Sequence, residues 1–399
     1  MGSAEVEHEA VSNFRKYLRI SSVHPNVDYS ECVEFLSSYA KDLRLPVRVV
    51  EVHPKKPIVV ITLAGSNPEL SSVLLNSHMD VVPVSPECWS HDPFAAEKDE
   101  NGNIFARGAQ DMKCVGIQYL ETIRRYIKEG LTLKRTVHLS FVPDEEIGGV
   151  LGMALFIEHE EFKKLNVGFC LDEGMPNPTE EFLLAYAERP IWHLTLKCSG
   201  TSGHGSLLHD NTAGEKVHYL INKFMQFRNS EKKKLLSNPA LTVGDVTTVN
   251  LTMLKGGLQS NVVPAELQVT FDIRVAVDVD HKHLVDTIKQ WCNEAGGGIE
   301  MDFEAQDPLM GLTKLDDSNP WWLAFKRECD KMNLSLKKVV FPGGTDCRFL
   351  RNIGIPALGY SPMNNTPNLL HGHDEYLNEK IFLRGIDIYY NIIKAVASS

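Results

Sequence analysis

The sequence has no long apolar run. Its 399 residues include no stretch near the length of about 20 apolar residues that a membrane-spanning helix needs. The acidic N-terminal segment also has no apolar core of the kind found in secretory signal peptides. We therefore expect a cytoplasmic protein that does not interact with membranes.

Paired cysteines and excess basic charge are missing as well. The 8 cysteines are scattered, and none forms a Cys-x-x-Cys pair, so we expect neither a disulfide framework nor a thiolate zinc site. Lysine and arginine number 41 against 52 aspartates and glutamates, which gives a formal net charge of −11. An acidic protein repels the phosphate backbone, and we expect no nucleic-acid partner.

The motifs of several other enzyme classes are incomplete. Residues 200–204 approach the Gly-x-Ser-x-Gly turn of serine hydrolases, but His204 stands where the last glycine belongs. The His159–Lys163 segment does not match the His-Glu-x-x-His pattern of one class of zinc protease, and no P-loop sequence occurs. These classes are therefore not favoured.

Apolar patterns predict two domains. Strand and helix signals alternate up to about residue 188 and again after residue 306, which predicts an α/β domain with a mainly parallel sheet over 1–188 and 306–399. Between them, residues 189–305 give the order β-α-β-β-α-β, which is the ferredoxin-like pattern. We expect this α+β module to be inserted into the first domain.

Histidine and carboxylate residues follow several of the predicted strands directly. An acidic pair at the end of one strand is usually a solvated turn. The carboxyl ends of parallel strands, however, meet at one edge of a sheet, where ligands bind in open α/β folds. The combination favours a carboxylate-rich metal site. Its candidates are His78, Asp80, Asp111, Glu145, Glu146, Asp172, Glu173 and His371.

The residue types indicate which metal such a site would take. Imidazole and carboxylate ligands without a thiolate suit zinc, and suit cobalt or manganese less well. Two ions would need a shared carboxylate, and together they can clamp the attacking and leaving oxygens of a hydrolysis. Asp80, two residues after His78, is placed to orient the imidazole of a metal-bound His78.

Four segments together resemble the M20 family of two-zinc metallopeptidases and amidohydrolases: Ser77–Asp80, Ala106–Lys113, Asp144–Gly149 and His371–Glu375. The resemblance runs through nearly the whole chain. Within the family it is strongest to the enzymes that hydrolyse N-acyl-L-amino acids, through Trp89–Phe94, Ser318–Trp322 and Ser361–Pro367. It implies a zinc-dependent exopeptidase-like catalytic domain, with the inserted module as a lid and dimerisation domain.

The resemblance also implies which residues bind the two zinc ions of each subunit. Asp111 would bridge the ions, His78 and Glu173 would complete one site, and Glu146 and His371 the other.

Further roles follow from the same resemblance. Glu145 would be the general base, and Asp80 would support His78. His204 of the inserted module would polarise the scissile carbonyl, and Asn261 and Arg274 would bind the substrate. The alternative for His204 is that it belongs to a mobile glycine loop and contacts nothing catalytic. Arg274 could be an edge arginine that lies along the surface, or a fork for the substrate carboxylate.

The family implies a small-molecule N-acyl amino acid as substrate and a homodimer as the assembly. Two alternatives remain open from the sequence. One is a dinuclear zinc dipeptidase of the same family. The other is a catalytically inert dimeric binding paralogue, which would be expected to lack a ligand or the base.

Overall fold

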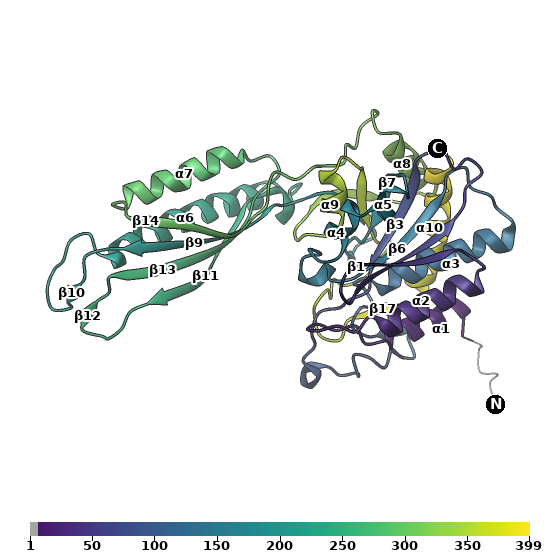
Figure 1. The fold of residues 1–399 in the computed structure, drawn as a ribbon, viewed down its shortest axis with the longest axis horizontal. Coiled ribbons are helices and arrows are strands. Elements are labelled where there is room, and N and C mark those ends of the chain that lie inside the picture. The colour runs from purple at the N-terminus through teal and green to yellow at the C-terminus, as the bar shows by residue number, and fades with distance from the viewer. Residues whose placement is uncertain (1–6) are drawn as a thin grey trace. The chain divides into compact units, whose positions relative to one another are not determined.

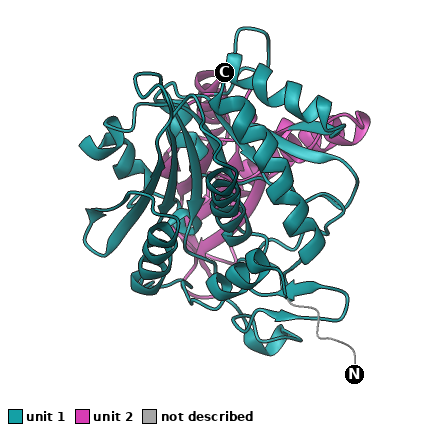
Figure 2. Cartoon of the chain, turned by 90° about the vertical axis from the view of Figure 1, so that its right-hand side faces the viewer, with its two compact units in different colours: residues 1–186, 312–338, 345–399 teal, residues 187–311, 339–344 magenta. Residues whose placement is uncertain are grey.

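The computed structural model describes residues 7–399, which divide into two compact units (Figure 2). Of the described residues, unit 1 contains residues 7–186, Leu312–Lys338 and Thr345–Ser399, and unit 2 contains Ala187–Gly311 and Val339–Gly344. Most of the acidic N-terminal segment on which the prediction of no signal peptide rests lies outside the described residues. Within residues 7–399, no helix is both long and apolar enough to cross a membrane.

An eight-stranded sheet organises the larger unit (Figure 1). Its central strands β6, β3, β7 and β16 pair in parallel, and strands on both sides of them pair antiparallel. The predicted α/β class is therefore confirmed. In order across the sheet, the strands are β1 (Val47–His53), β2 (Lys56–Leu63), β6 (Val137–Val142), β3 (Ser72–His78), β7 (Val167–Asp172), β16 (Ala357–Tyr360), β8 (Phe182–Glu188) and β15 (Leu336–Phe341).

Helices cover both faces of this sheet. Successive residues of a strand point to opposite sides, so a strand that is apolar throughout needs a covering layer on each side. In β3, Val73 and Leu75 belong to the core under one set of helices, and Leu74 belongs to the core under the other. The first set is α1 (Glu9–Leu18), α2 (Ser30–Asp42), α3 (Lys113–Glu129), α8 (Pro320–Lys331) and α10 (Glu379–Ala397). The second is α4 (Met153–Glu158), α5 (Glu160–Lys163) and α9 (Cys347–Asn352).

A small three-stranded sheet brings residues 376–378 next to residues 97–105. It consists of β4 (Glu97–Lys98), β5 (Asn103–Phe105) and β17 (Tyr376–Asn378). Beyond β5 the pairing continues, because the amide of Ala106 donates to the carbonyl of Glu375. Two 3-10 turns, η1 (Pro86–Cys88) and η2 (Glu145–Ile147), complete the elements of this part of the chain.

Unit 2 contains the predicted ferredoxin-like order. Its antiparallel sheet β11-β13-β9-β14 packs against two helices, and the core between them includes Trp192, Phe224 and Ile288. The elements are β9 (Ile191–Ser199), α6 (Ala213–Ser237), β11 (Thr248–Gly256), β13 (Glu266–Arg274), α7 (His281–Glu294) and β14 (Ile299–Gln306). A two-stranded ribbon, β10 (Gly203–His204) with β12 (Val262–Val263), and η3 (Val243–Asp245) complete it.

The structure differs from the sequence expectation at the boundary of the inserted segment. Unit 2 extends beyond 189–305 and also takes in residues 339–344. One reason is Arg189, which is buried and donates to the carbonyl oxygens of Val246 and Pro342. A guanidinium that joins two distant backbone carbonyls leaves no trace in the local sequence pattern.

Candidate metal centre

Three neighbouring parallel strands end at the same edge of the large sheet, and each delivers candidate ligands there. His78 is the last residue of β3, Glu145 and Glu146 form the turn η2 after β6, and Glu173 directly follows β7. Asp111 lies in the turn before α3, and His371 lies in the loop between β16 and β17. This convergence is what the strand-end pattern predicted.

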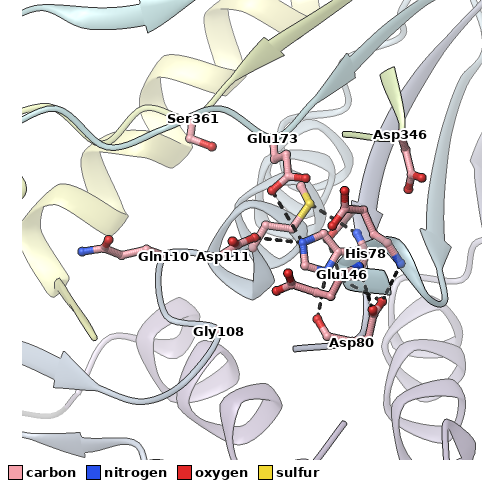
Figure 3. Close-up of polar contacts among 12 residues, drawn as sticks. His78, Asp80, Gly108, Gln110, Asp111, Glu146, Glu173, Asp346 and Ser361 are labelled. Atoms are coloured by element: carbon pink, nitrogen blue, oxygen red, sulfur yellow. Dashed lines mark hydrogen bonds and ion pairs between the residues drawn. The ribbon is translucent and has the colours of Figure 1, made fainter. Parts of the chain in front are cut away.

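Asp111 stands between two histidine–glutamate pairs. Its Oδ1 is 2.9 Å from Nε2 of His78, and that nitrogen is 3.5 Å from Oε2 of Glu173. Its Oδ2 is 3.3 Å from Nε2 of His371, which is 3.0 Å from Oε2 of Glu146. Figure 3 shows the side chains of Asp111 and Glu173 directed at His78. The two oxygens of one carboxylate thus face two separate sets of nitrogen and oxygen donors.

The donors lie close enough for a metal ion to collect them. Ligand atoms of His78, Asp111 and Glu146 all lie within 4.8 Å of one another, and so do those of His78, Glu145 and Glu173. Glu145 therefore shares the site with the expected ligands. Its side chain is nearly buried, which suits a carboxyl group that has to exchange protons with a bound molecule.

The Asp80 carboxylate makes its hydrogen bonds with the turn that follows β6. The Nδ1 atom of His78 lies 2.8 Å from the backbone carbonyl of Asp80, whereas the carboxylate is 3.9 Å away. That carboxylate instead accepts hydrogen bonds from the backbone amides of Glu145 and Glu146 and contacts Nε2 of His24 at 2.9 Å. The expected support of His78 by the Asp80 carboxylate, which forms only this longer ion pair with the imidazole, stays a prediction. The side chain of Asp80 holds the turn that carries the two glutamates.

Glu375 is a part of the site that the sequence reasoning missed. It is fully buried and accepts hydrogen bonds from the backbone amides of Gly108, Gln110 and Asp111 and from Nη1 of Arg107. These bonds fix the turn that presents Asp111. The sequence signal was available, since an acidic residue stands four positions after His371, but nothing local shows that it contacts residues 107–111.

The electrostatics of the cluster suit a bound cation. Burial raises the pKa of Glu145 and Glu173 well above the usual range, and nearby carboxylates add to the effect. Although burial alone would lower it, the pKa of His78 is raised well above its ordinary value by Glu173 and Asp111. Hydrogen bonds with Asp111 and Glu146 raise the pKa of His371 to about 10. Several acids competing for protons in one buried site are what a divalent cation would relieve.

The donor set fits a metal ion chemically. The oxygens and imidazole nitrogens are of the types that zinc takes, and no thiolate is among them. Among the described residues, the buried Oε1 atom of Glu146 has no hydrogen-bond partner, which suits an oxygen that would bind an ion. The 8 cysteines, in turn, are free thiols, of which Cys88 is exposed and the others are buried.

The remaining predicted residues belong to unit 2, whereas the candidate ligands belong to unit 1. His204 lies on β10 opposite Val262, and its Nδ1 accepts a hydrogen bond from the amide of Ser206. Asn261 is beside it, since its carbonyl accepts from the amide of Gly205. Arg274 ends β13, and its Nε and Nη2 both donate to the carboxylate of Asp272.

The chain was compared with known protein families and sequences. Residues 74–395 match the model of peptidase family M20/M25/M40. Aminoacylase-1 of Homo sapiens is 51% identical over 394 residues, which cover 99% of this chain and 97% of that protein. Aminoacylase-1 of Dictyostelium discoideum is 46% identical over 399 residues, with 97% of each chain covered.

Solved structures show the same fold at much lower sequence identity. An M20 family metallo-carboxypeptidase from Sulfolobus solfataricus superimposes with a TM-score of 0.72 at 18% identity, covering 98% of this chain and 100% of that one. The aminopeptidase PepT from Bacillus cereus gives 0.73 at 17% identity, covering 97% and 98%. A peptidase from Bacillus subtilis described as a dinuclear metal-binding member of the M20 family gives 0.69 at 15%, covering 97% of each.

Proposed function

This chain belongs to peptidase family M20/M25/M40, and from that membership we propose that it is a zinc-dependent amidohydrolase. It hydrolyses the amide bond of N-acyl-L-amino acids to a free L-amino acid and a carboxylate. The observation that carries this conclusion is the similarity to aminoacylase-1 along nearly the whole chain. The candidate metal centre lies within the matched residues, and every expected position in it is filled.

We assign two zinc ions to each subunit. His78 and Glu173 would hold one ion, and Glu146 and His371 the other. Asp111 would serve both, since its two oxygens face the two sets. Bound there, the ions would polarise the amide carbonyl and make a water molecule more acidic.

Glu145 moves the proton during the reaction. Its carboxylate takes a proton from the attacking water as the water oxygen bonds to the amide carbon. The carboxyl group then gives this proton to the amide nitrogen as the carbon–nitrogen bond breaks. The amine leaves as the free amino acid, and the acyl group leaves as a carboxylate. The backbone amide of Glu145 is held by Asp80, which keeps the base beside the donors of the site.

Residues of unit 2 recognise the substrate in this proposal. The guanidinium of Arg274 binds the α-carboxylate of the amino acid while it also donates to the carboxylate of Asp272. His204 donates to the oxyanion that forms as water attacks, and Asn261, which lies beside His204, contacts the substrate.

We propose a cytoplasmic homodimer in which the partner subunit supplies His204. The edge strand β11 supports this assembly, because most of its residues are exposed, including Met253 and Leu254. An exposed edge of this kind can pair with a second copy. Release of free amino acids would place the enzyme in amino acid metabolism.

Turnover measured on a panel of N-acyl amino acids and dipeptides tests the function. We expect hydrolysis of the acylated substrates and only weak activity on dipeptides. The Glu145→Gln variant should keep its zinc and lose at least about a hundredfold in kcat. Preferential cleavage of dipeptides would favour the dipeptidase. A zinc-loaded protein without turnover on either class would favour the inert binding paralogue.

A further inference from the structure

Asp144, the residue before the proposed base, has a left-handed backbone conformation. Its φ is 64°, in the left-handed region, which aspartate adopts more readily than most residues because its short side chain can form hydrogen bonds nearby. Its carbonyl accepts hydrogen bonds from the amides of Ile147 and Gly149, so this conformation sets the path of the turn η2. Whatever holds Asp144 therefore also sets the direction in which Glu145 leaves the strand end.

The hydroxyl of Tyr29 contacts Asp144 at two points. It donates to Oδ1 of Asp144 at 2.8 Å and accepts from the backbone amide of the same residue at 3.0 Å. Both side chains are buried. Burial and the charges of Asp80 and Asp144 raise the pKa of Tyr29, so the phenol remains a donor. One hydroxyl thus fixes both the side chain and the backbone of Asp144.

Lys56 contacts the same carboxylate. Its Nζ lies 2.7 Å from Oδ1 and 2.6 Å from Oδ2 of Asp144, and the two side chains are 18% and 1% exposed. The ammonium also lies over the ring of Tyr29, 5.7 Å from its centre. Tyr29 precedes α2 and Lys56 begins β2, so two separate parts of unit 1 meet at Asp144.

We propose that Tyr29 and Lys56 are positioning residues for catalysis, which act through Asp144 on Glu145. They hold the left-handed conformation of Asp144, and with it the orientation of the turn, before substrate binds. Neither of them is among the proposed metal ligands. The inference rests on the proposed role of Glu145 as the base. We call Tyr29 and Lys56 together the clamp. Without the clamp, kcat should fall while substrate affinity and metal content are maintained, because misplacing a reacting group by about 1 Å can lower the rate about a hundredfold.

The experiment compares Tyr29→Phe, Lys56→Met and the double variant with two matched controls. Tyr126→Phe removes a hydroxyl that donates to the carbonyl of Tyr390, and Lys98→Met removes an ion pair with Glu379. Three quantities are measured: amide hydrogen exchange of the segment 143–149 in the substrate-free protein, zinc content, and kcat with KM on an N-acetyl amino acid.

We expect the segment 143–149 to exchange at least about tenfold faster in both single variants and at the wild-type rate in the controls. The kcat should fall about tenfold or more, with KM within about twofold and zinc content unchanged. The double variant should lose less than the product of the two single losses, because both residues act on Asp144. Exchange and kcat equal to those of the controls would overturn the proposal, as would a kcat loss that merely follows zinc loss. If the wild type hydrolyses no N-acyl amino acid, the proposed function fails, and the exchange rates alone decide whether the clamp exists.

Discussion

The substitution Asp80→Asn separates two possible roles of this carboxylate. In the structure it is fully buried and meets three donors: the amides of Glu145 and Glu146 at 3.2 and 3.0 Å and Nε2 of His24 at 2.9 Å. An asparagine keeps one acceptor oxygen but turns an NH₂ group towards the other donors. At least one buried donor is then left unsatisfied, and the remaining bonds lose their charge. Together these losses amount to about 2–4 kcal/mol of unfolding free energy.

Urea unfolding of the metal-free protein measures this loss. A carboxylate that only oriented the imidazole of His78 would lower zinc affinity by about ten- to a hundredfold and leave the metal-free protein as stable as the wild type. The arrangement seen here predicts that the metal-free protein is destabilised. Asp99→Asn is a matched control, because Asp99 accepts hydrogen bonds from the backbone amides of Asn101 and Asn103 in a solvent-accessible loop. If the unfolding free energy of metal-free Asp80→Asn lies within about 0.5 kcal/mol of the wild-type value, the reasoning is refuted.

Three further predictions concern the substrate, the assembly and pH. Arg274→Lys should lower kcat/KM on free N-acyl amino acids and have little effect on their amides, because lysine lacks the bidentate fork; equal losses on both would indicate a structural arginine. Co-refolding Glu145→Ala with His204→Ala should restore about a quarter of wild-type activity, since random pairing makes half the dimers mixed with one competent site each; no recovery in proven mixed dimers would place His204 in its own subunit's site. Burial lowers the pKa of His138 from 6.5 to about 4, so below pH 6.5 the unfolded chain binds a proton that the folded protein excludes. Stability should therefore fall by up to about 3 kcal/mol between pH 6.5 and 4, and His138→Gln should flatten this slope in urea midpoints measured across that range.

The positions of the candidate ligands could be predicted because their signal is local. His78 and Glu173 directly end or follow apolar runs, and the topology of parallel strands places such residues at one edge. Gly130 is a local signal of the same kind, because its left-handed conformation ends the helix α3. Patterns of this kind depend on neighbours in sequence, so the sequence is enough to find them.

The supports of the site depend on contacts between distant residues. Tyr29 is separated from Asp144 by 115 positions, and Glu375 from Asp111 by 264. Their hydrogen bonds have no periodicity that a sequence pattern could reveal. Helix α4 begins at Met153, and at Gly152 before it a Cβ atom would lie 2.1 Å from the carbonyl oxygen of Pro143, a close approach between residues nine positions apart. Helix α10 buries one face in the core that it shares with α3 and α8, which lie far from it in the sequence.

The order of the ligands along the chain bears on biosynthesis. His78, Asp111, Glu146 and Glu173 all precede unit 2, whereas His371 follows it. Since translation proceeds from the N-terminus, the ribosome makes the main part of unit 2 before it makes the last ligand. A nascent chain can therefore display most of the acidic cluster while the histidine that faces Glu146 does not yet exist. The order of synthesis thus delays completion of the histidine–carboxylate cluster until the main part of unit 2 has been made.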